Sequence, residues 1–164
     1  MVPKDNKAFI FYFLMSVIFC DFANQLKKLS YSFGVGENPI FSIIHTKNTG
    51  GAFSILENNA NILAYFGILA IILLTVYVYK NVTFKDKLIL LSSTLFCAGI
   101  FGNTLERYTQ GYVIDYIKLN FINFPIFNSF DILICIAIFL YITFIFIDAN
   151  IVQKGKNDKN QNIK

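Results

Sequence analysis

The amino-acid sequence predicts an all-α integral membrane protein with four transmembrane helices and a small extracytoplasmic β element. Of its 164 residues, 55% are hydrophobic and only 15% are charged, against about 25% charged residues in an average soluble domain. Four stretches are long enough to cross a bilayer, which takes about 20 mostly apolar residues in a helix. No Pro/Gly/Ser-rich linker divides the chain, so we expect residues 1–164 to form a single membrane domain.

The four spans are expected at residues 8–26, 62–79, 88–105 and 130–147. The first contains one charged residue, Asp21, and the second contains none. The third is uncharged until Glu106, which follows it directly, and Asp131 lies at the start of the fourth. The basic, apolar beginning of the chain resembles a secretory signal peptide, but no small-residue cleavage site follows, so we expect a retained first span.

Basic residues predict the orientation of these spans. Lysines precede the first span, occupy the link at residues 80–87 and recur in the tail at residues 153–164. Because cytoplasmic loops carry an excess of Lys and Arg, we expect these three segments to be cytoplasmic. The connections at residues 27–61 and 106–130 then face the opposite side. The tail is expected to be disordered and to contact anionic lipid, and the net charge of +4 then implies no nucleic-acid partner.

Parts of the two outer connections have a strand-like composition. Residues 40–44 are rich in β-branched and aromatic side chains and precede a turn-rich segment at 47–51, which predicts a small sheet or hairpin. Residues 112–116 read as a second short extended piece. Residues 121–130 are apolar but interrupted by Pro125, and we expect them to lie at the membrane interface.

The cysteines and the single histidine form no metal-binding pattern. Cys20, Cys97 and Cys135 all fall in apolar stretches without CxxC spacing, so they are interpreted as lipid- or core-facing packing residues rather than zinc ligands or disulfides. His45 has no second histidine beside it, and catalytic zinc needs three protein ligands. We therefore expect no metal site and no other cofactor.

Charged residues at span ends are costly, so each needs a partner, a hydrated cavity or a function. Five of them share the predicted outer side: Asp21, Glu106, Arg107, Asp115 and Asp131. Two carboxylates held together in a poorly solvated site cannot both ionise easily, so one keeps a proton and the other acts as a base. Such a pair suits peptide hydrolysis by an activated water. From spacing alone, interfacial aspartates that pair with Arg107 or a lysine remain the commoner reading.

Four segments together resemble the lipoprotein signal peptidases, also called signal peptidase II. They are the region of Asp21 and residues 48–54, 102–115 and 127–131. The resemblance implies that Asp115, on the family's Gly-x-Val-Val-Asp motif, and Asp131, on its Phe-Asn-x-x-Asp motif, are the catalytic aspartates. Residues 48–54 look similar to the family's extracytoplasmic sheet platform. The positions implied to support the dyad or contact the substrate are Asp21, Asn48, Gly50, Asn103, Arg107 and Asn128.

The function implied by this resemblance is that of a membrane aspartyl endopeptidase of the bacterial cytoplasmic (inner) membrane. Both termini would be cytoplasmic and the active site would lie near the extracytoplasmic face. The substrate would be a prolipoprotein whose lipobox cysteine already carries diacylglycerol, cut just before that cysteine. Membrane lipids are expected contacts, whereas no obligate protein partner and no nucleic acid are expected.

Two positions depart from the family pattern. The first motif usually reads Asp-Gln-x-Ser/Thr-Lys, but Gln25 occupies the lysine position here, and Lys27 and Lys28 follow it. The residue before the arginine of the third motif is usually Asp and is Glu106 here. These departures leave a catalytically inactive relative or a non-enzymatic membrane scaffold as alternatives. A proton-coupled transporter is a further alternative, but it predicts acids near the bilayer midplane and inverted repeats.

Overall fold

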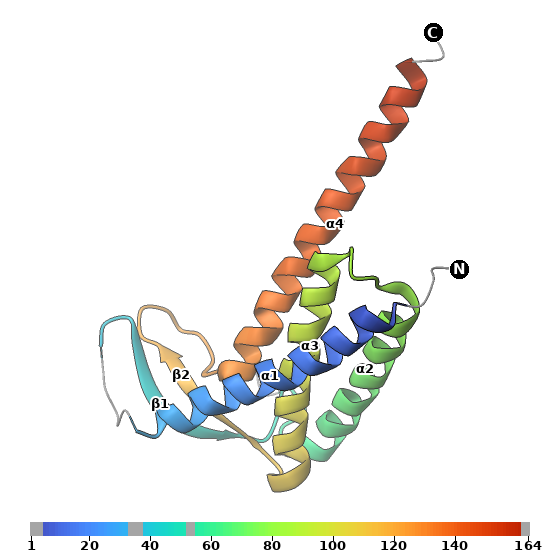
Figure 1. Ribbon diagram of the computed structural model, residues 1–164. Helices are drawn as coiled ribbons and strands as arrows, with labels where there is room; N and C mark the ends of the chain where they lie inside the picture. Colours follow the sequence, from blue (N-terminus) through green and yellow to red (C-terminus); the bar gives the residue numbers. More distant parts are fainter. Residues whose placement is uncertain (1–4, 33–37, 52–54, 162–164) are drawn as a thin grey trace.

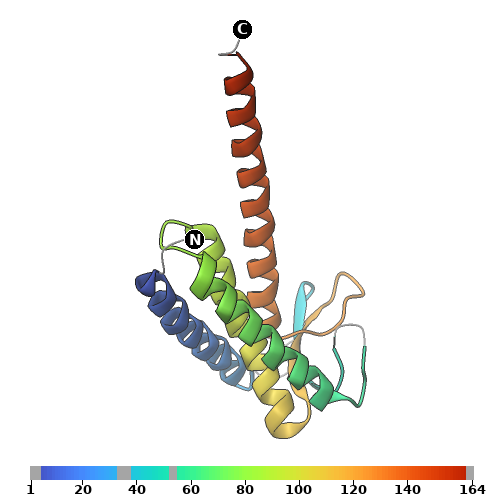
Figure 2. The ribbon, with the colours of Figure 1, turned by 90° about the vertical axis from the view of Figure 1, so that its right-hand side faces the viewer.

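The computed structural model describes residues 5–32, 38–51 and 55–161, with side chains described up to residue 150. Its elements follow in the order α1 (Asn6–Ser30), β1 (Phe41–Asn48), α2 (Ala60–Asn81), α3 (Lys87–Gln110), β2 (Val113–Leu119) and α4 (Ser129–Gln161). The two strands lie toward one end of the helices, and the start of α1, the α2–α3 connection and the end of α4 lie toward the other (Figure 1). The view turned by 90° shows the same separation (Figure 2).

All four helices are long and apolar enough to cross a membrane, which confirms the predicted four-span architecture. Each helix begins one or two residues before the predicted span and continues beyond its predicted end. The difference arises because hydropathy marks only the apolar part of a helix, whereas polar residues at its ends still form the backbone hydrogen bonds. The outer faces of α1, α2 and α4 carry many exposed apolar side chains, as expected for helices that face lipid.

Helix α3 lies at the centre of the bundle and packs against the other three helices. Most of its apolar window is buried, and the buried positions include small residues such as Ser92, Ala98 and Gly102. Small side chains let membrane helices approach closely. At Gly102 a Cβ atom would lie 2.2 Å from the ring of Phe130 in α4. The glycine therefore permits the close contact of α3 with the start of α4.

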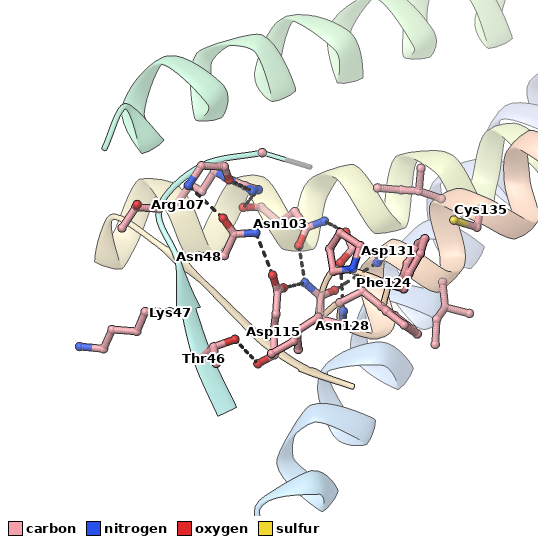
Figure 3. A pocket seen from close by; sticks show the side chains of 18 of the residues that line it. Thr46, Lys47, Asn48, Asn103, Arg107, Asp115, Phe124, Asn128, Asp131 and Cys135 are labelled. Atoms are coloured by element: carbon pink, nitrogen blue, oxygen red, sulfur yellow. Dashed lines mark hydrogen bonds between the residues drawn. The ribbon is translucent and has the colours of Figure 1, made fainter. Parts of the chain in front are cut away.

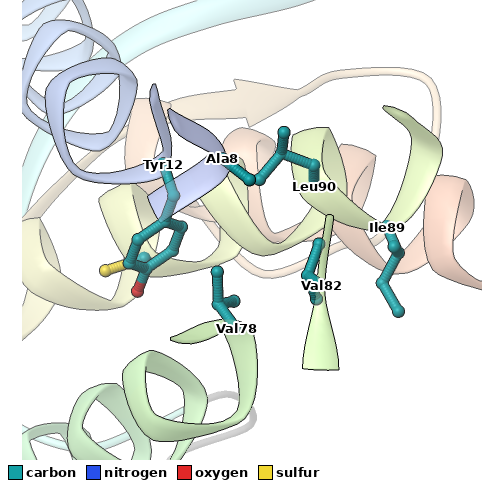
Figure 4. Close-up of a cluster of buried hydrophobic side chains, with 7 residues drawn as sticks. Ala8, Tyr12, Val78, Val82, Ile89 and Leu90 are labelled. Carbon is teal, nitrogen blue, oxygen red and sulfur yellow. The ribbon is translucent and has the colours of Figure 1, made fainter. Parts of the chain in front are cut away.

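Two clusters of buried apolar side chains hold the helices together. The first joins α1, α2 and α3, and its buried members are Ala8, Tyr12, Val78, Val82, Ile89, Leu90 and Cys97 (Figure 4). The second joins α1, α3 and α4, and its buried members are Ala23, Leu95, Ala98, Phe130, Leu133 and Ala137. Because Phe130 directly precedes Asp131, the second cluster fixes the first turn of α4.

The sheet consists of β1 and β2, which pair in antiparallel orientation. This confirms the predicted small β element, although the strands are displaced or longer than the expected segments 40–44 and 112–116. A local hairpin at residues 40–51 is wrong, because the partner of β1 follows only after α2 and α3. The register places Thr46 opposite Asp115 and Asn48 opposite Val113. The pairing therefore brings the end of β1 beside Asp115.

The connection from β2 to α4 folds back along the strand. Phe127 forms an antiparallel bridge with Ile117, and its carbonyl oxygen accepts hydrogen bonds from the backbone N–H groups of Tyr116 and Ile117. The preceding Phe121 and Phe124 expose about half or more of their surface. Their location at the membrane interface remains a prediction.

The tail differs from its expected state. Disorder was expected for residues 153–164, but α4 continues as a helix to Gln161, and Figure 1 shows it projecting beyond the other helices. Residues 151–161 contain no proline, although Gly155, Asn157, Asp158 and Asn160 are poor helix formers. Extending an existing helix avoids the cost of a new nucleus. Residues 162–164 lie outside the described part of the chain.

Candidate active site

The strands and the adjoining ends of α3 and α4 surround a cavity of about 890 Å³, a size typical of ligand-binding sites. Seven of the eight residues singled out in the sequence line it: Asn48, Gly50, Asn103, Arg107, Asp115, Asn128 and Asp131 (Figure 3). These residues come from β1, the turn after it, α3, β2 and the start of α4. The fold therefore brings together residues from widely separated parts of the chain.

Asp21 is the eighth predicted residue, and it is not among those that line this cavity. Its side chain is exposed on α1. Oδ1 of Asp21 accepts a hydrogen bond of 3.5 Å from Nε2 of Gln25, one turn further along the helix. Gln25, which occupies the lysine position of the family motif, is thus a neutral partner for this carboxylate.

Asp115 is the most enclosed carboxylate of the cavity, with 4% of its surface exposed. Strand β2 turns this side chain toward α3 and α4, and two asparagines bind it. Nδ2 of Asn48 donates to Oδ2 at 2.8 Å, and Nδ2 of Asn128 donates to Oδ1 at 2.7 Å. Each oxygen of the carboxyl group therefore has an amide donor.

Asp131 lies in the first turn of α4 and takes part in a reciprocal capping arrangement. Oδ1 of Asn128 accepts from the backbone N–H groups of Phe130 at 2.7 Å and Asp131 at 3.1 Å. In return, Oδ2 of Asp131 accepts from the backbone N–H of Asn128 at 3.0 Å. This is the capping-box pattern, which satisfies amides left free at a helix start. Negative charge is favoured there by the helix dipole.

The amide of Asn128 completes a hydrogen-bonded chain across the cavity. Besides Asp115, its Nδ2 contacts Oδ1 of Asn103 at 3.1 Å, and Nδ2 of Asn103 donates to Oδ1 of Asp131 at 2.8 Å. Asn128 is 1% exposed, and both its oxygen and its nitrogen have partners. Asn128 thus donates to both carboxylates, Asn48 donates to Asp115 alone and Asn103 to Asp131 alone.

Burial raises the pKa of the Asp115 carboxyl above its ordinary value. The hydrogen bonds from Asn48 and Asn128 oppose this effect by stabilising the ionised form, and the nearby charge of Asp131 adds to it. The Arg107 guanidinium also opposes it. The net direction is upward, so Asp115 retains its proton to higher pH than an exposed aspartate.

Arg107 anchors the turn after β1 to α3. Its Nη2 donates to the carbonyl oxygen of Gly50 at 2.6 Å, and its Nη1 donates to the carbonyl oxygen of Asn103 at 3.3 Å. The backbone N–H of Gly50 donates to Oδ1 of Asn48 at 2.9 Å. The arginine therefore supports the same asparagine whose amide binds Asp115. Residues 52–54, which complete the family-like segment 48–54, lie outside the described residues.

Sequence reasoning missed two features of the site. One is the apolar wall of the cavity, which comes from the β2–α4 connection and one face of α4 and includes Phe124, Ile132 and Cys135. Cys135 is a free, exposed thiol, and its apolar context predicted a packing residue that faces either lipid or the core without placing it at the cavity. The other is an ion pair between Lys27 and Glu106 at 2.5 Å, so the lysine displaced from the family position pairs with Glu106.

Comparisons with known proteins identify the family of this chain. The family model described as Signal peptidase (SPase) II matches residues 10–147. A lipoprotein signal peptidase of Enterococcus faecalis is 30% identical over 163 residues, which cover 94% of this chain and 99% of that protein. A lipoprotein signal peptidase of Clostridium tetani is 32% identical over 128 residues, which cover 73% and 79% respectively.

A solved structure described as a bacterial membrane enzyme is also similar to this chain. It superposes with a TM-score of 0.74 at 25% identity and covers 84% of this chain and 88% of that one. The two chains thus share their overall fold. Since the family model matches most of the chain and the Enterococcus relative aligns with nearly all of it, this protein belongs to the signal peptidase II family of membrane peptidases.

Proposed function

We propose that this chain is an aspartyl endopeptidase that removes the signal peptide from diacylglyceryl-modified prolipoproteins by cleaving just before the lipidated cysteine. Family membership supports the substrate class. One observation supports the aspartic mechanism: Asp115 and Asp131 line the same cavity, and Asn128 donates to both of them, through Nδ2 and its backbone N–H respectively.

The environments of the two carboxylates differ. Asp131 lies at the start of α4 and accepts hydrogen bonds from Nδ2 of Asn103 and the backbone N–H of Asn128. Asp115 is almost fully buried, and burial raises its pKa. We therefore assign the base to Asp131 and the proton to Asp115, as is expected when two neighbouring acids differ in environment.

In the reaction that follows from this assignment, the oxygen of a water molecule attacks the scissile carbonyl carbon, and Asp131 accepts a proton from that water. Protonated Asp115 donates a hydrogen bond to the carbonyl oxygen, on which negative charge develops. When the tetrahedral intermediate collapses, the carbon–nitrogen bond breaks and the proton held by Asp131 passes to the leaving amine. Asn48, Asn103 and Asn128 keep the two carboxyl groups oriented throughout.

The apolar wall of the cavity supports the choice of a lipid-modified substrate. Phe124, Ile126, Ile132 and Ile136 line the cavity alongside the two aspartates. Each methylene of an acyl chain that leaves water for an apolar site contributes about 0.8 kcal/mol. Diacylglycerol on the cysteine would therefore hold the adjacent peptide bond near the carboxylates.

The proposed orientation has the sheet and the cavity at the extracytoplasmic face of the bacterial inner membrane, with both termini in the cytoplasm. The lysine-rich segments support it through the positive-inside rule. The start of α1, the α2–α3 connection and the end of α4 lie at the end of the bundle opposite the sheet (Figure 1), which is consistent with this arrangement.

The test uses the purified protein with a prolipoprotein in two forms, with and without diacylglycerol on the lipobox cysteine. We expect cleavage of the modified form only, and mass spectrometry of the product should show the lipidated cysteine as its new first residue. The contrary result is an intact modified substrate that a known active signal peptidase II cleaves under the same conditions. That result would favour an inactive relative of the family.

A further inference from the structure

Glu106 lies near the end of α3 and makes contacts with three other residues. Its Oε1 forms the ion pair with Nζ of Lys27 at 2.5 Å. Its Oε2 accepts hydrogen bonds from the backbone N–H of Ile114 at 3.0 Å and from Nε2 of Gln110 at 3.3 Å. The side chains of Glu106 and Lys27 are only 13% and 15% exposed. This carboxylate is therefore held between α1, α3 and β2.

The contact with Ile114 fixes the backbone next to Asp115. Helix α3 ends at Gln110 and is capped by Gly111, whose φ of 78° lies in the left-handed region, and β2 begins two residues after this glycine. Gln110 also donates to the carbonyl oxygen of Tyr112 at 3.1 Å. Glu106 and Gln110 thus fasten both sides of the turn through which the chain enters the strand that carries Asp115.

Lys27 connects this turn to a third element. It lies in the last turn of α1, whose end also contacts β1, because Oγ of Ser30 lies 2.8 Å from Nε2 of His45. The end of α1 is therefore connected to β1 through Ser30 and to β2 through Lys27 and Glu106. A largely buried carboxylate needs its cation, since an unpaired charge in such a place is strongly unfavourable. Lys27 accordingly holds the Glu106 side chain in place.

We propose that Glu106, held by Lys27, is a positioning residue for Asp115: its carboxylate fixes the first residues of β2 and so keeps Asp115 in hydrogen-bond reach of Asn48 and Asn128. This inference rests on the proposed catalytic role of Asp115. Neither Glu106 nor Lys27 is among the residues that line the cavity, so the effect acts through the backbone rather than on the substrate.

This arrangement predicts a specific kinetic signature. A displacement of about 1 Å in a reacting group costs on the order of 100-fold in rate, so loss of the Glu106 contacts should lower kcat. KM should change little, because the substrate-lining residues are untouched. The hydrogen bonds from Asn48 and Asn128 lower the pKa of Asp115, and weakening them should move the alkaline limb of the activity profile to higher pH.

The experiment compares Glu106→Ala, Glu106→Gln and Lys27→Met with the wild-type enzyme. Glutamine retains an oxygen that can accept from Ile114 but loses the ion pair, whereas alanine loses both. Lys28→Met is the matched control, because Lys28 is an exposed neighbour in the same helical turn. Each variant is purified in detergent, its folded fraction is checked by thermal unfolding, and kcat, KM and the pH profile are measured on the lipidated prolipoprotein.

The expected result is a fall in kcat of about 100-fold for Glu106→Ala, a smaller fall for Glu106→Gln and Lys27→Met, and no change for Lys28→Met. The upward shift of the alkaline limb should accompany each fall. Wild-type kcat and pH profile in the Gln and Met variants, with only a lower unfolding temperature, would show a structural role and overturn the inference.

A parallel Asp115→Asn variant separates the two hypotheses. If Asp115→Asn is inactive while the Glu106 and Lys27 variants retain full kcat, only the positioning role fails. If Asp115→Asn retains activity, the proposed function of Asp115 fails, and the positioning role fails with it. Should Glu106→Ala not fold, Glu106→Gln and Lys27→Met decide the outcome, because both substitutions preserve most of the side-chain volume.

Discussion

Asn128 donates a hydrogen bond of 2.7 Å from its side-chain amide to Oδ1 of Asp115. The same residue caps α4 through its side-chain oxygen and donates its backbone N–H to Asp131. Asp115 lies on β2 and Asp131 on α4, so their relative position depends on a residue that binds both. One asparagine thus combines a structural role at the helix start with an electrostatic role between two acids.

Replacing Asn128 separates these two roles. Asn128→Ser keeps a good helix cap but cannot reach Asp115. Asn128→Ala loses both the cap and the contact with Asp115, so it should be less stable than Asn128→Ser by about 1 kcal/mol. We expect kcat to fall by about 100-fold in both variants, the magnitude typical of a lost active-site donor, with a lower unfolding temperature mainly in Asn128→Ala. Near-wild-type kcat in a folded Asn128→Ser variant would contradict the role of the amide.

The raised pKa of Asp115 predicts how activity and stability depend on pH. Above the ordinary aspartate pKa of 3.8, the unfolded chain has lost this proton while the folded chain still binds it. The folded state therefore loses stability as pH rises from that value through the raised pKa. Asp115→Asn removes this contribution, so its unfolding temperature relative to wild type should increase across the same window. Parallel curves for the two proteins would contradict a raised pKa.

Because the mechanism needs one ionised and one protonated aspartate, activity should fall at both low and high pH. The rise in activity at acid pH reports the first ionisation of the Asp115–Asp131 pair. The fall at alkaline pH reports loss of the proton assigned to Asp115. Because the two acids interact, both apparent pKa values belong to the pair. Measuring kcat against pH should give a bell-shaped curve, and a profile without an alkaline limb would argue against a protonated Asp115.

The turn after β1 provides a matched pair of glycines. A Cβ atom at Gly50 would lie 3.0 Å from the carbonyl oxygen of Ile55 and 3.3 Å from Cα of Glu57, whereas at Gly51 its nearest contact would be 3.5 Å. Gly50→Ala should therefore displace the carbonyl that Arg107 binds and lower kcat/KM by about tenfold or more, given the sensitivity of rate to misplacement. Gly51→Ala should be tolerated. Equal activity of the two variants would contradict the role of this turn.

The contact between α3 and α4 is expected to be equally intolerant of added volume. Gly102→Ala would place a methyl group against the ring of Phe130, and overpacking of this kind typically costs about 1–3 kcal/mol. Because Asp131 follows Phe130, activity should fall with stability. Thermal unfolding and cleavage rates in detergent test this expectation, and unchanged values for both would show that the helices can separate without consequence.

Much of the bundle could be predicted from the sequence, because the bilayer imposes a strong rule on it. A helix that crosses hydrocarbon needs a long apolar stretch, and the four stretches correspond to α1, α2, α3 and α4. The residues of the candidate site were named through the resemblance to the signal peptidase II family, because spacing alone favoured interfacial aspartates that pair with Arg107 or a lysine. In the structure, Asn48, Asn103 and Asn128 bind the two aspartates.

The contacts between distant segments could not be predicted in this way. Composition marks a strand but does not name its partner, so the pairing that places Thr46 opposite Asp115 was not foreseen. The ion pair of Lys27 with Glu106 depends on how α1 crosses α3, which no spacing in the chain specifies. Cys135 has the same apolar neighbours as a packing residue, and only the position of α4 beside the sheet exposes it to the cavity.

The most direct test of the central claim is the turnover of diacylglyceryl-modified prolipoprotein by purified Asp115→Asn and Asp131→Asn variants beside the wild-type enzyme. Both substitutions preserve the size of the side chain and remove its ionisation. The proposed mechanism predicts cleavage by the wild type and no detectable product from either variant, with both variants folded and inserted in the membrane. Near-wild-type turnover by either variant would contradict the assignment of the two aspartates as the catalytic pair.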